Sequence, residues 1–186
     1  MAQILSKMIP LLSKIPSFEL PDAVSGQNLS YSILKGNEAT LIMFICNHCP
    51  FVIYINEELV RLANDYASKG ISFIAISSND IVNFPQDSPE LMKRTALENR
   101  YPFPYLYDES QEVAKSFEAA CTPDFFIYNK NDELFYRGQL DDSRPGNGKS
   151  LTGKDIRNAL NCILSSQKID NNQIPSIGCN IKWKTD

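Results

Sequence analysis

The 186-residue sequence has little of what marks several large classes of protein. It contains one histidine and one tryptophan, its net charge is only −4, and its lysines and arginines are scattered rather than clustered. Without a basic patch, neither nucleic acid nor a membrane surface is expected as the main partner. No apolar run approaches the roughly 18 residues of a membrane span. The first residues also lack the charged and apolar regions of a secretory signal peptide.

The cysteines do not form the pattern of a disulfide framework. There are five, an odd number at irregular spacing: Cys46, Cys49, Cys121, Cys162 and Cys179. Small secreted proteins that depend on disulfides usually carry an even number at regular spacings. We therefore expect the protein in the reducing cytoplasm, and we expect any disulfide that it forms to be catalytic rather than structural.

What the sequence does contain is a C-x-x-C motif, Cys46 to Cys49, directly after the apolar run 39–45 and directly before Pro50. This position is typical of a buried strand that leads into a helix. Unpaired N–H groups and the macrodipole at a helix N-terminus favour a thiolate, which is the reactive form of cysteine. We expect Cys46 to lie at the exposed helix tip as the nucleophile with a lowered pKa. Cys49, one turn inside, would then resolve the mixed disulfide.

His48 is the only histidine and lies between the two cysteines. An imidazole near a thiolate stabilises it, by charge when protonated or by hydrogen bonding when neutral. We therefore expect His48 to tune the redox pair. The alternative is a partly exposed histidine without a tuning role.

The periodicity of apolar residues predicts an α/β domain. Strands are expected at residues 18–22, 29–33, 39–45, 71–77, 124–128 and 133–136. Helices are expected from residue 50 to about residue 70, at 89–98, at 111–117 and from residue 152 to 164. This order indicates parallel crossovers followed by an antiparallel hairpin, and hence a mixed sheet. We expect a single domain over residues 1–186, with a core at about 15–166 and a tail, 167–186, packed on it.

Four segments carry a resemblance to a known family: residues 44–50, 119–126, 141–149 and 175–183. They resemble a peroxiredoxin-like branch of the thioredoxin-like superfamily, related to alkyl hydroperoxide reductases and thiol-specific antioxidant proteins. The resemblance implies a thioredoxin fold with three α/β/α layers, a central mixed sheet and an N-terminal β-hairpin. It also implies that Pro123 is a cis proline facing the motif. The backbone of Thr122 would then be offered to an extended substrate segment, so Thr122 and Pro123 are the expected substrate-binding residues.

The chain departs from thioredoxin-like reductases in two respects. Ile45 stands where these proteins usually have tryptophan, and the run 39–45 contains no carboxylate. The proton acceptor that would activate Cys49 is therefore not identified. Asn79 and Asp80, at the end of the next strand, are the candidates.

The chain also departs from typical peroxiredoxins, which carry threonine three residues before the reactive cysteine. Met43 stands three residues before Cys46. The cation that peroxide chemistry uses would have to come from Arg137 or Arg144. A thiol peroxidase with an antioxidant role is therefore the second choice among enzymes.

A metal site is the alternative of another class. Cys46, His48 and Cys49 could supply ligands, but a closed structural zinc site needs four. Cys121 and Cys179 would have to complete it, and there is no second C-x-x-C. We expect no bound metal, and keep a non-catalytic metal-binding or redox-sensing module as the alternative.

Two further cysteines have open roles. Cys121 either approaches the redox pair or is a buried apolar residue. Cys179 either lies near another thiol, or belongs to a tail that only buries Ile181 and Trp183. We prefer the second alternative for the tail, because large aromatic side chains usually anchor by burial.

The sequence thus predicts a thiol–disulfide oxidoreductase that needs no cofactor beyond the redox-active Cys46–Cys49 disulfide. The expected substrate is a disulfide-containing protein, a small thiol or a peroxide. A reductase would donate the electrons.

Overall fold

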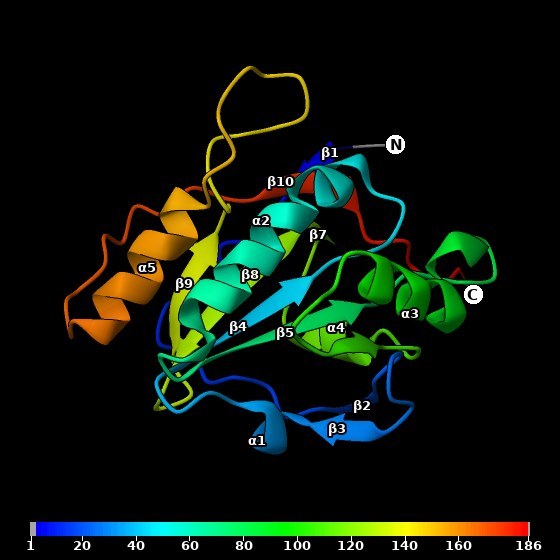
Figure 1. The fold of residues 1–186 in the computed structure, drawn as a ribbon, viewed down its shortest axis with the longest axis horizontal. Coiled ribbons are helices and arrows are strands. Elements are labelled where there is room, and N and C mark those ends of the chain that lie inside the picture. The colour runs from blue at the N-terminus through cyan, green and yellow to red at the C-terminus, as the bar shows by residue number, and fades with distance from the viewer. Residues whose placement is uncertain (1–2, 186) are drawn as a thin grey trace.

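The computed structural model describes residues 3–185, and its centre is a five-stranded sheet (Figure 1). The strand order is β6-β5-β4-β8-β9. Their bounds are β4 Ala39–Phe44, β5 Ile71–Ser77, β6 Tyr105–Tyr107, β8 Asp124–Asn129 and β9 Leu134–Gly138. β5 pairs in parallel with β4 and β6, whereas β8 is antiparallel to β4 and β9. The predicted α/β class with a mixed sheet is confirmed.

The central strand β4 is buried on both faces, which explains its continuous apolar run. Leu41 and Met43 belong to the hydrophobic cluster on one face, and Ile42 and Phe44 to the cluster on the other. Because side chains alternate along a strand, this one segment joins the two halves of the core.

Helices lie on both faces of the sheet and complete three layers. The first face carries α2 (Pro50–Ala67), α3 (Pro89–Glu98) and α5 (Lys154–Leu164). The second carries α1 (Tyr31–Leu34), α4 (Glu112–Ser116) and the antiparallel hairpin of β2 (Glu19–Pro21) and β3 (Asn28–Ser30). A 3₁₀ turn, η1 (Pro85–Asp87), precedes α3. The expected three-layer thioredoxin fold with an N-terminal hairpin is present.

One strand prediction is wrong. Residues 29–33 were expected to be extended throughout, but the strand β3 ends at Ser30 and Tyr31 begins the short helix α1. Tyr31 is buried while Ile33 is 75% exposed, so this segment has one buried side chain and not a buried face. The alternation of apolar residues in this segment predicted a strand, but Ile33 is not buried against the sheet.

A second, small sheet was not expected. Strand β10 (Ile177–Asn180) pairs antiparallel with β1 (Gln3–Leu5) on one edge and with β7 (Cys121–Thr122) on the other. Figure 1 shows β1, near the start of the chain, beside the red β10. Strands of two to four residues are too short to show a period in the sequence.

The tail buries less than expected. Ile181 is 1% exposed, as predicted, but Trp183 is 39% exposed, so tryptophan burial is not what holds the tail. Strand pairing on both edges of β10 holds it instead.

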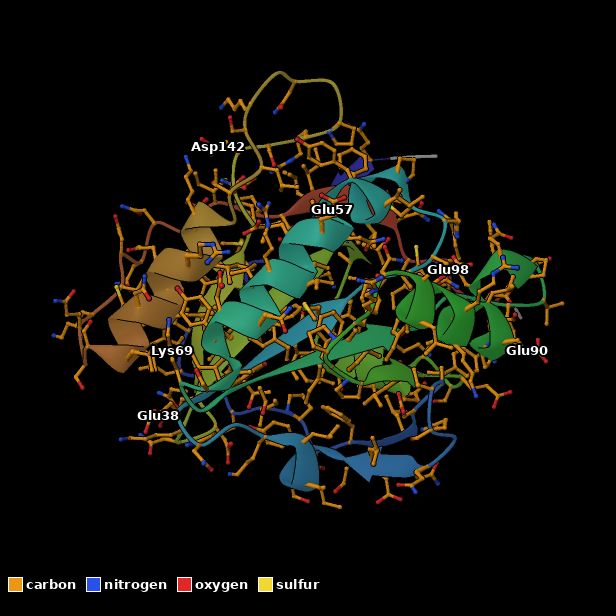
Figure 2. All side chains as sticks on the ribbon, viewed as in Figure 1. Glu38, Glu57, Lys69, Glu90, Glu98 and Asp142 are labelled. Atoms are coloured by element: carbon orange, nitrogen blue, oxygen red, sulfur yellow. The ribbon has the colours of Figure 1, made fainter. Side chains whose placement is uncertain are left out.

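The surface is charged and mixed in sign. Figure 2 labels Glu57 on α2, Lys69 beyond the end of that helix and Glu90 on α3, and all three are exposed. Among residues 3–185, no helix has the length and apolar character needed to cross a membrane.

The aromatic cluster on the second face gives a test of the core. Phe117 is fully buried and its ring lies 5.4 to 6.1 Å from those of Phe18, Phe44, Phe126 and Tyr128. Phe117→Ala is expected to lower the free energy of unfolding by about 3–5 kcal/mol, because it leaves a cavity. Urea unfolding measures this change.

The control is Ile33→Ala, which truncates an apolar side chain that is 75% exposed. It should change stability by less than about 0.5 kcal/mol. Similar losses in the two variants would contradict the assignment of Phe117 to the core.

Candidate redox site

The C-x-x-C motif lies between the end of β4 at Phe44 and the start of α2 at Pro50, as predicted. Its two cysteines are not placed as expected. The residue that caps the helix is Cys49, and Cys46 precedes the helix. Cys46 is 2% exposed and Cys49 0% exposed, so neither sulfur stands at an open helix tip.

Thr122 and Pro123 face the motif. The Thr122–Pro123 peptide bond is cis, as the resemblance implied. The hydroxyl of Thr122 lies 3.4 Å from Cys46 Sγ, and its carbonyl oxygen accepts a hydrogen bond of 3.1 Å from Cys49 Sγ. One residue therefore contacts both sulfurs.

The backbone of Thr122 is not open to a substrate segment, contrary to expectation. Strand β10 pairs with it, with Cys179 opposite Thr122 and Asn180 opposite Cys121. The register at which an extended substrate was expected to pair is thus filled by the protein's own chain.

This pairing brings a third cysteine into the site. Cys179 is 3% exposed, and its Sγ lies 2.8 Å from that of Cys49. The expectation that the tail only buries apolar side chains is therefore wrong. The sequence placed Cys179 in a segment that resembles the family, but no pattern in the sequence indicated that its neighbour would be Cys49.

Hydrogen bonds at the two motif cysteines separate their pKa values. The pKa of Cys49 is lowered to about 5, first because Cys46 donates to it, and further because Cys179 and the N–H of Val52 do. These donors outweigh burial, which acts in the other direction. The helix N-terminus favours the same charge.

Cys46 has the opposite shift, so the expectation of a lowered pKa there is wrong. Its pKa is raised well above the usual value. The causes are its hydrogen bond to Cys49, its burial and the nearby carboxylate of Asp87. For Cys179, burial and the contact with Cys49 raise the pKa to about 12. Of the three sulfurs, Cys49 is thus the one whose pKa is lowered, and in its protonated form it donates to the carbonyl of Thr122.

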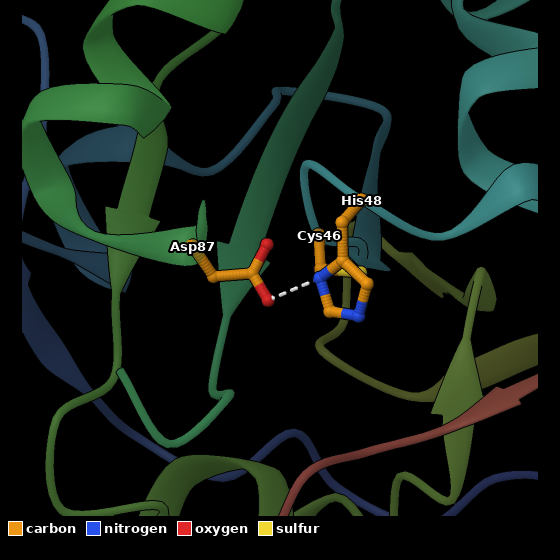
Figure 3. A group of neighbouring side chains, drawn as sticks. All are labelled: Cys46, His48 and Asp87. Carbon is orange, nitrogen blue, oxygen red and sulfur yellow. Dashed lines mark ion pairs between the residues drawn. The ribbon is translucent and has the colours of Figure 1, made fainter. Parts of the chain in front are cut away.

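His48 has a carboxylate partner that the sequence analysis missed. Its Nδ1 lies 2.7 Å from Oδ2 of Asp87, within ion-pair distance. Figure 3 shows Asp87 facing the imidazole, with Cys46 beside it. The ring of Phe84 stacks on that of His48, with centroids 5.9 Å apart.

Asp87 is fully buried and organises the loop around the motif. It accepts hydrogen bonds of 2.8 Å from the backbone N–H of Asn47 and from the side chain of Asn79. It lies in η1, 41 positions beyond Cys46, and not in the strand before the motif, where thioredoxin-like reductases often have a buried acid. No pattern in the sequence marks it, because only the fold brings η1 to the motif.

The two accessory residues after β5 have different positions. Asn79 reaches the site through Asp87 and also accepts a hydrogen bond of 2.8 Å from the backbone N–H of Lys182. Asp80 instead binds the backbone N–H of Val82 and the side chain of Asn83. Asp80 therefore shapes its own turn, and among the described residues it makes no hydrogen bond to a motif cysteine.

Among the described residues, Cys121, Arg137 and Arg144 make no hydrogen bond to a motif cysteine. Cys121 is fully buried, and burial raises its pKa. Its Sγ donates a hydrogen bond to the carbonyl of Pro123. Arg137 binds Gln173. Arg144 binds carbonyl oxygens of its own loop and lines a shallow hollow together with Phe51 and Pro123.

Cys46, His48 and Asp87 form a group whose ligand-type atoms lie within 4.8 Å of one another. These three donors could contact one metal ion. A closed zinc site needs four ligands, and the nearby Cys49 is already engaged by Thr122 and Cys179.

The fold and the buried dithiol site define a thioredoxin-like protein. The family model described as AhpC/TSA family matches residues 11–137. The chain belongs to this family, which confirms the resemblance seen in the sequence and supports a thiol-based redox function.

Two solved structures are similar to nearly the whole chain. The chain is similar to the crystal structure of an uncharacterized conserved protein from Geobacillus kaustophilus, with 54% identity, a TM-score of 0.98 and coverage of 100% of this chain and 98% of the other. A hypothetical protein from Sinorhizobium meliloti 1021 has 46% identity, a TM-score of 0.95 and coverage of 98% and 99%.

More distant neighbours share the fold. The thioredoxin domain of a thiol-disulfide oxidoreductase from Bacteroides vulgatus has a TM-score of 0.65 at 16% identity, over 84% of this chain and 99% of the other. A search of curated proteins gives no match.

The position of the thiolate can be measured by titration. The ultraviolet absorbance of thiolate in the reduced protein is expected to rise by one group as the pH increases through about 5, because Cys49 loses its proton there. Below that pH the thiolate is lost. Cys49→Ser should remove this step.

Cys121→Ser is the matched control, because Cys121 is buried with a raised pKa and should stay protonated. It should leave the step in place. A step that survives in Cys49→Ser but disappears in Cys46→Ser would show that the thiolate belongs to Cys46.

Proposed function

We propose that the protein is a thiol–disulfide oxidoreductase that reduces or exchanges disulfides through Cys46 and Cys49. The observation that carries this proposal is a buried dithiol at the strand-to-helix junction, with both sulfurs against Thr122 and the pKa of Cys49 lowered by its contact with Cys46. Thiol–disulfide exchange needs a thiolate and a second thiol within reach. Family membership supports the same chemistry.

Cys46 is the entry sulfur in this proposal. Cys49 is enclosed by the carbonyl of Thr122 and by Cys179, whereas Cys46 precedes the helix and contacts the hydroxyl of Thr122, so Cys46 is the sulfur left for an incoming disulfide. As Cys46 attacks, the proton that it shares passes to Cys49. One substrate sulfur then bonds to Cys46, and the other leaves as a thiolate.

Cys49 completes the reaction by attacking Cys46 Sγ. The Cys46–Cys49 disulfide forms, the bond between Cys46 and the substrate breaks, and the second substrate sulfur leaves. The substrate gains two electrons and two protons. The two cysteines supply both electrons and the one proton that they share, and the second proton comes from solvent. A thiol reductase must return the electrons, and no other cofactor is needed.

Substrate binding must use a surface other than the paired edge of Thr122. The hollow lined by Phe51, Pro123 and Arg144 is the candidate, because it includes the cis proline and the first turn of α2. Its lining is apolar and cationic. It therefore suits a protein substrate with an apolar or acidic residue next to the cysteine of its disulfide.

Turnover of a disulfide substrate tests the proposal. The wild-type protein is expected to accelerate insulin reduction by dithiothreitol, and Cys46→Ser should lose this acceleration because the attacking sulfur is gone. The assay follows the turbidity of the released insulin chains.

Cys162→Ser serves as the control, because Cys162 lies on α5 and its one thiol contact, at 4.0 Å, is to Asn158 of the same helix. It should retain the wild-type rate. Equal rates in the wild type and Cys46→Ser would refute the function.

Thiol peroxidase activity is the second candidate, favoured by the AhpC/TSA family match. We expect it to be weak. Met43 replaces the threonine of typical peroxiredoxins, Arg137 is bound to Gln173 and Arg144 to its own loop.

Stopped-flow mixing of the reduced protein with hydrogen peroxide separates the two functions. The rate constant is expected to stay within about tenfold of that of a free thiol at the same thiolate fraction. A rate several orders of magnitude higher, lost in Cys46→Ser but kept in Cys162→Ser, would make the peroxidase the principal activity.

A further inference from the structure

Cys179 is a buried nucleophilic side chain that the proposed reaction does not use. Its Sγ lies 2.8 Å from Cys49 Sγ, across 130 positions of sequence. The motif partner Cys46 also contacts Cys49, so the sulfur of Cys49 lies between two other thiols. Three sulfurs in one buried site allow two different disulfides, and both include Cys49.

Backbone contacts fix Cys179 in this position. Strand β1 covers one edge of β10 and β7 the other. The hydroxyl of Ser176 donates a hydrogen bond of 2.8 Å to the carbonyl of Pro123, and the backbone N–H of Lys182 donates to Asn79 at 2.8 Å. Hydrogen bonds of residues before and after Cys179 in the sequence therefore fix its position.

Gly178 allows the close approach. A Cβ atom built at this position would collide with the carbonyl of Thr122. Glycine directly before Cys179 thus lets β10 lie against β7 at the distance that brings the two sulfurs together. A larger residue would displace the strand that carries Cys179.

We propose that Cys179 is a third redox-active cysteine, which exchanges with the Cys46–Cys49 disulfide to give a Cys49–Cys179 disulfide. The proposal rests on the proposed function of the same site. Cys179 loses its proton and attacks Cys49 Sγ. The Cys46–Cys49 bond breaks, its electron pair leaves on Cys46, and Cys46 takes up a proton. One disulfide replaces another, so no oxidant or reductant is required.

The exchange returns Cys46 to the thiol form while the protein stays oxidised. β10 pairs with Thr122 in the register expected for a substrate, so Cys179 acts as an internal substrate cysteine. An oxidised molecule can then still attack a disulfide through Cys46. A site with only two cysteines has no free thiol after oxidation.

Disulfide mapping of Cys46→Ser tests the proposal in the full-length chain. The reduced variant is treated with glutathione disulfide, quenched with acid, alkylated and digested, and its linked peptides are identified by mass spectrometry. The expected product is the Cys49–Cys179 disulfide, in at least about tenfold excess over the glutathione adduct of Cys49, because a positioned thiol competes at high effective concentration. Cys49 carrying glutathione with Cys179 alkylated would overturn the proposal.

Two measurements keep the test decisive. Should Cys46→Ser not fold, the same mapping of the wild type decides: a Cys49–Cys179 peptide beside the Cys46–Cys49 peptide supports the exchange, and the Cys46–Cys49 peptide alone overturns it. In oxidised wild type, maleimide should label Cys46 in part of the molecules. Cys162→Ser, as control, should give the wild-type pattern.

Cys179→Ser distinguishes exchange from hydrogen bonding alone. Serine keeps a hydroxyl donor towards Cys49 but forms no disulfide. The maleimide-labelled fraction of Cys46 in the oxidised protein should disappear in this variant. Unchanged labelling would show that Cys179 only donates a hydrogen bond.

The failure of this inference differs from the failure of the proposed function. Insulin turnover without a Cys49–Cys179 disulfide refutes the inference alone. A Cys49–Cys179 disulfide without insulin turnover refutes the function alone and leaves Cys179 as a redox-active residue of another reaction.

Discussion

The site depends on the position of Thr122. Its hydroxyl contacts Cys46, its carbonyl contacts Cys49, and its backbone pairs with the strand that carries Cys179. Three segments that are far apart in the sequence thus meet at one residue. The cis peptide bond to Pro123 and the start of β8 fix Thr122 against the end of β4. Moving this residue would separate the sulfurs from one another.

Burial and charge then decide which sulfur ionises. Cys49 lies at a helix N-terminus among hydrogen-bond donors, whereas Cys46 lies beside the buried carboxylate of Asp87. In a site shielded from water, such differences are larger than they would be at the surface. The environment thus lowers the pKa of one thiol and raises the pKa of a chemically identical neighbour. The contact of Asp87 with His48 adds a second polar pair on the Cys46 side.

The sequence predicted the parts of the molecule that have local signals. The buried run of β4, the helical spacing of α2 and the motif between them predicted the fold class and the place of the candidate cysteine pair, because each is encoded within about twenty residues. Asp87 and Cys179 were not assigned, because they join the site through tertiary packing. Strand β10 has four residues and no period, and its partner β7 has two. The electrostatics of Cys46 could not be predicted without the position of Asp87.

The separation of Cys49 and Cys179 along the chain links redox state to the entropy of the unfolded protein. A bond between them would close a loop of 130 residues, whereas a bond between Cys46 and Cys49 closes a loop of only a few. In the chain-entropy model a loop of this length restricts the unfolded ensemble enough to stabilise the fold by about 5 kcal/mol. Two disulfides that share one sulfur and hold the same number of electrons would then differ in how firmly they hold the whole domain together.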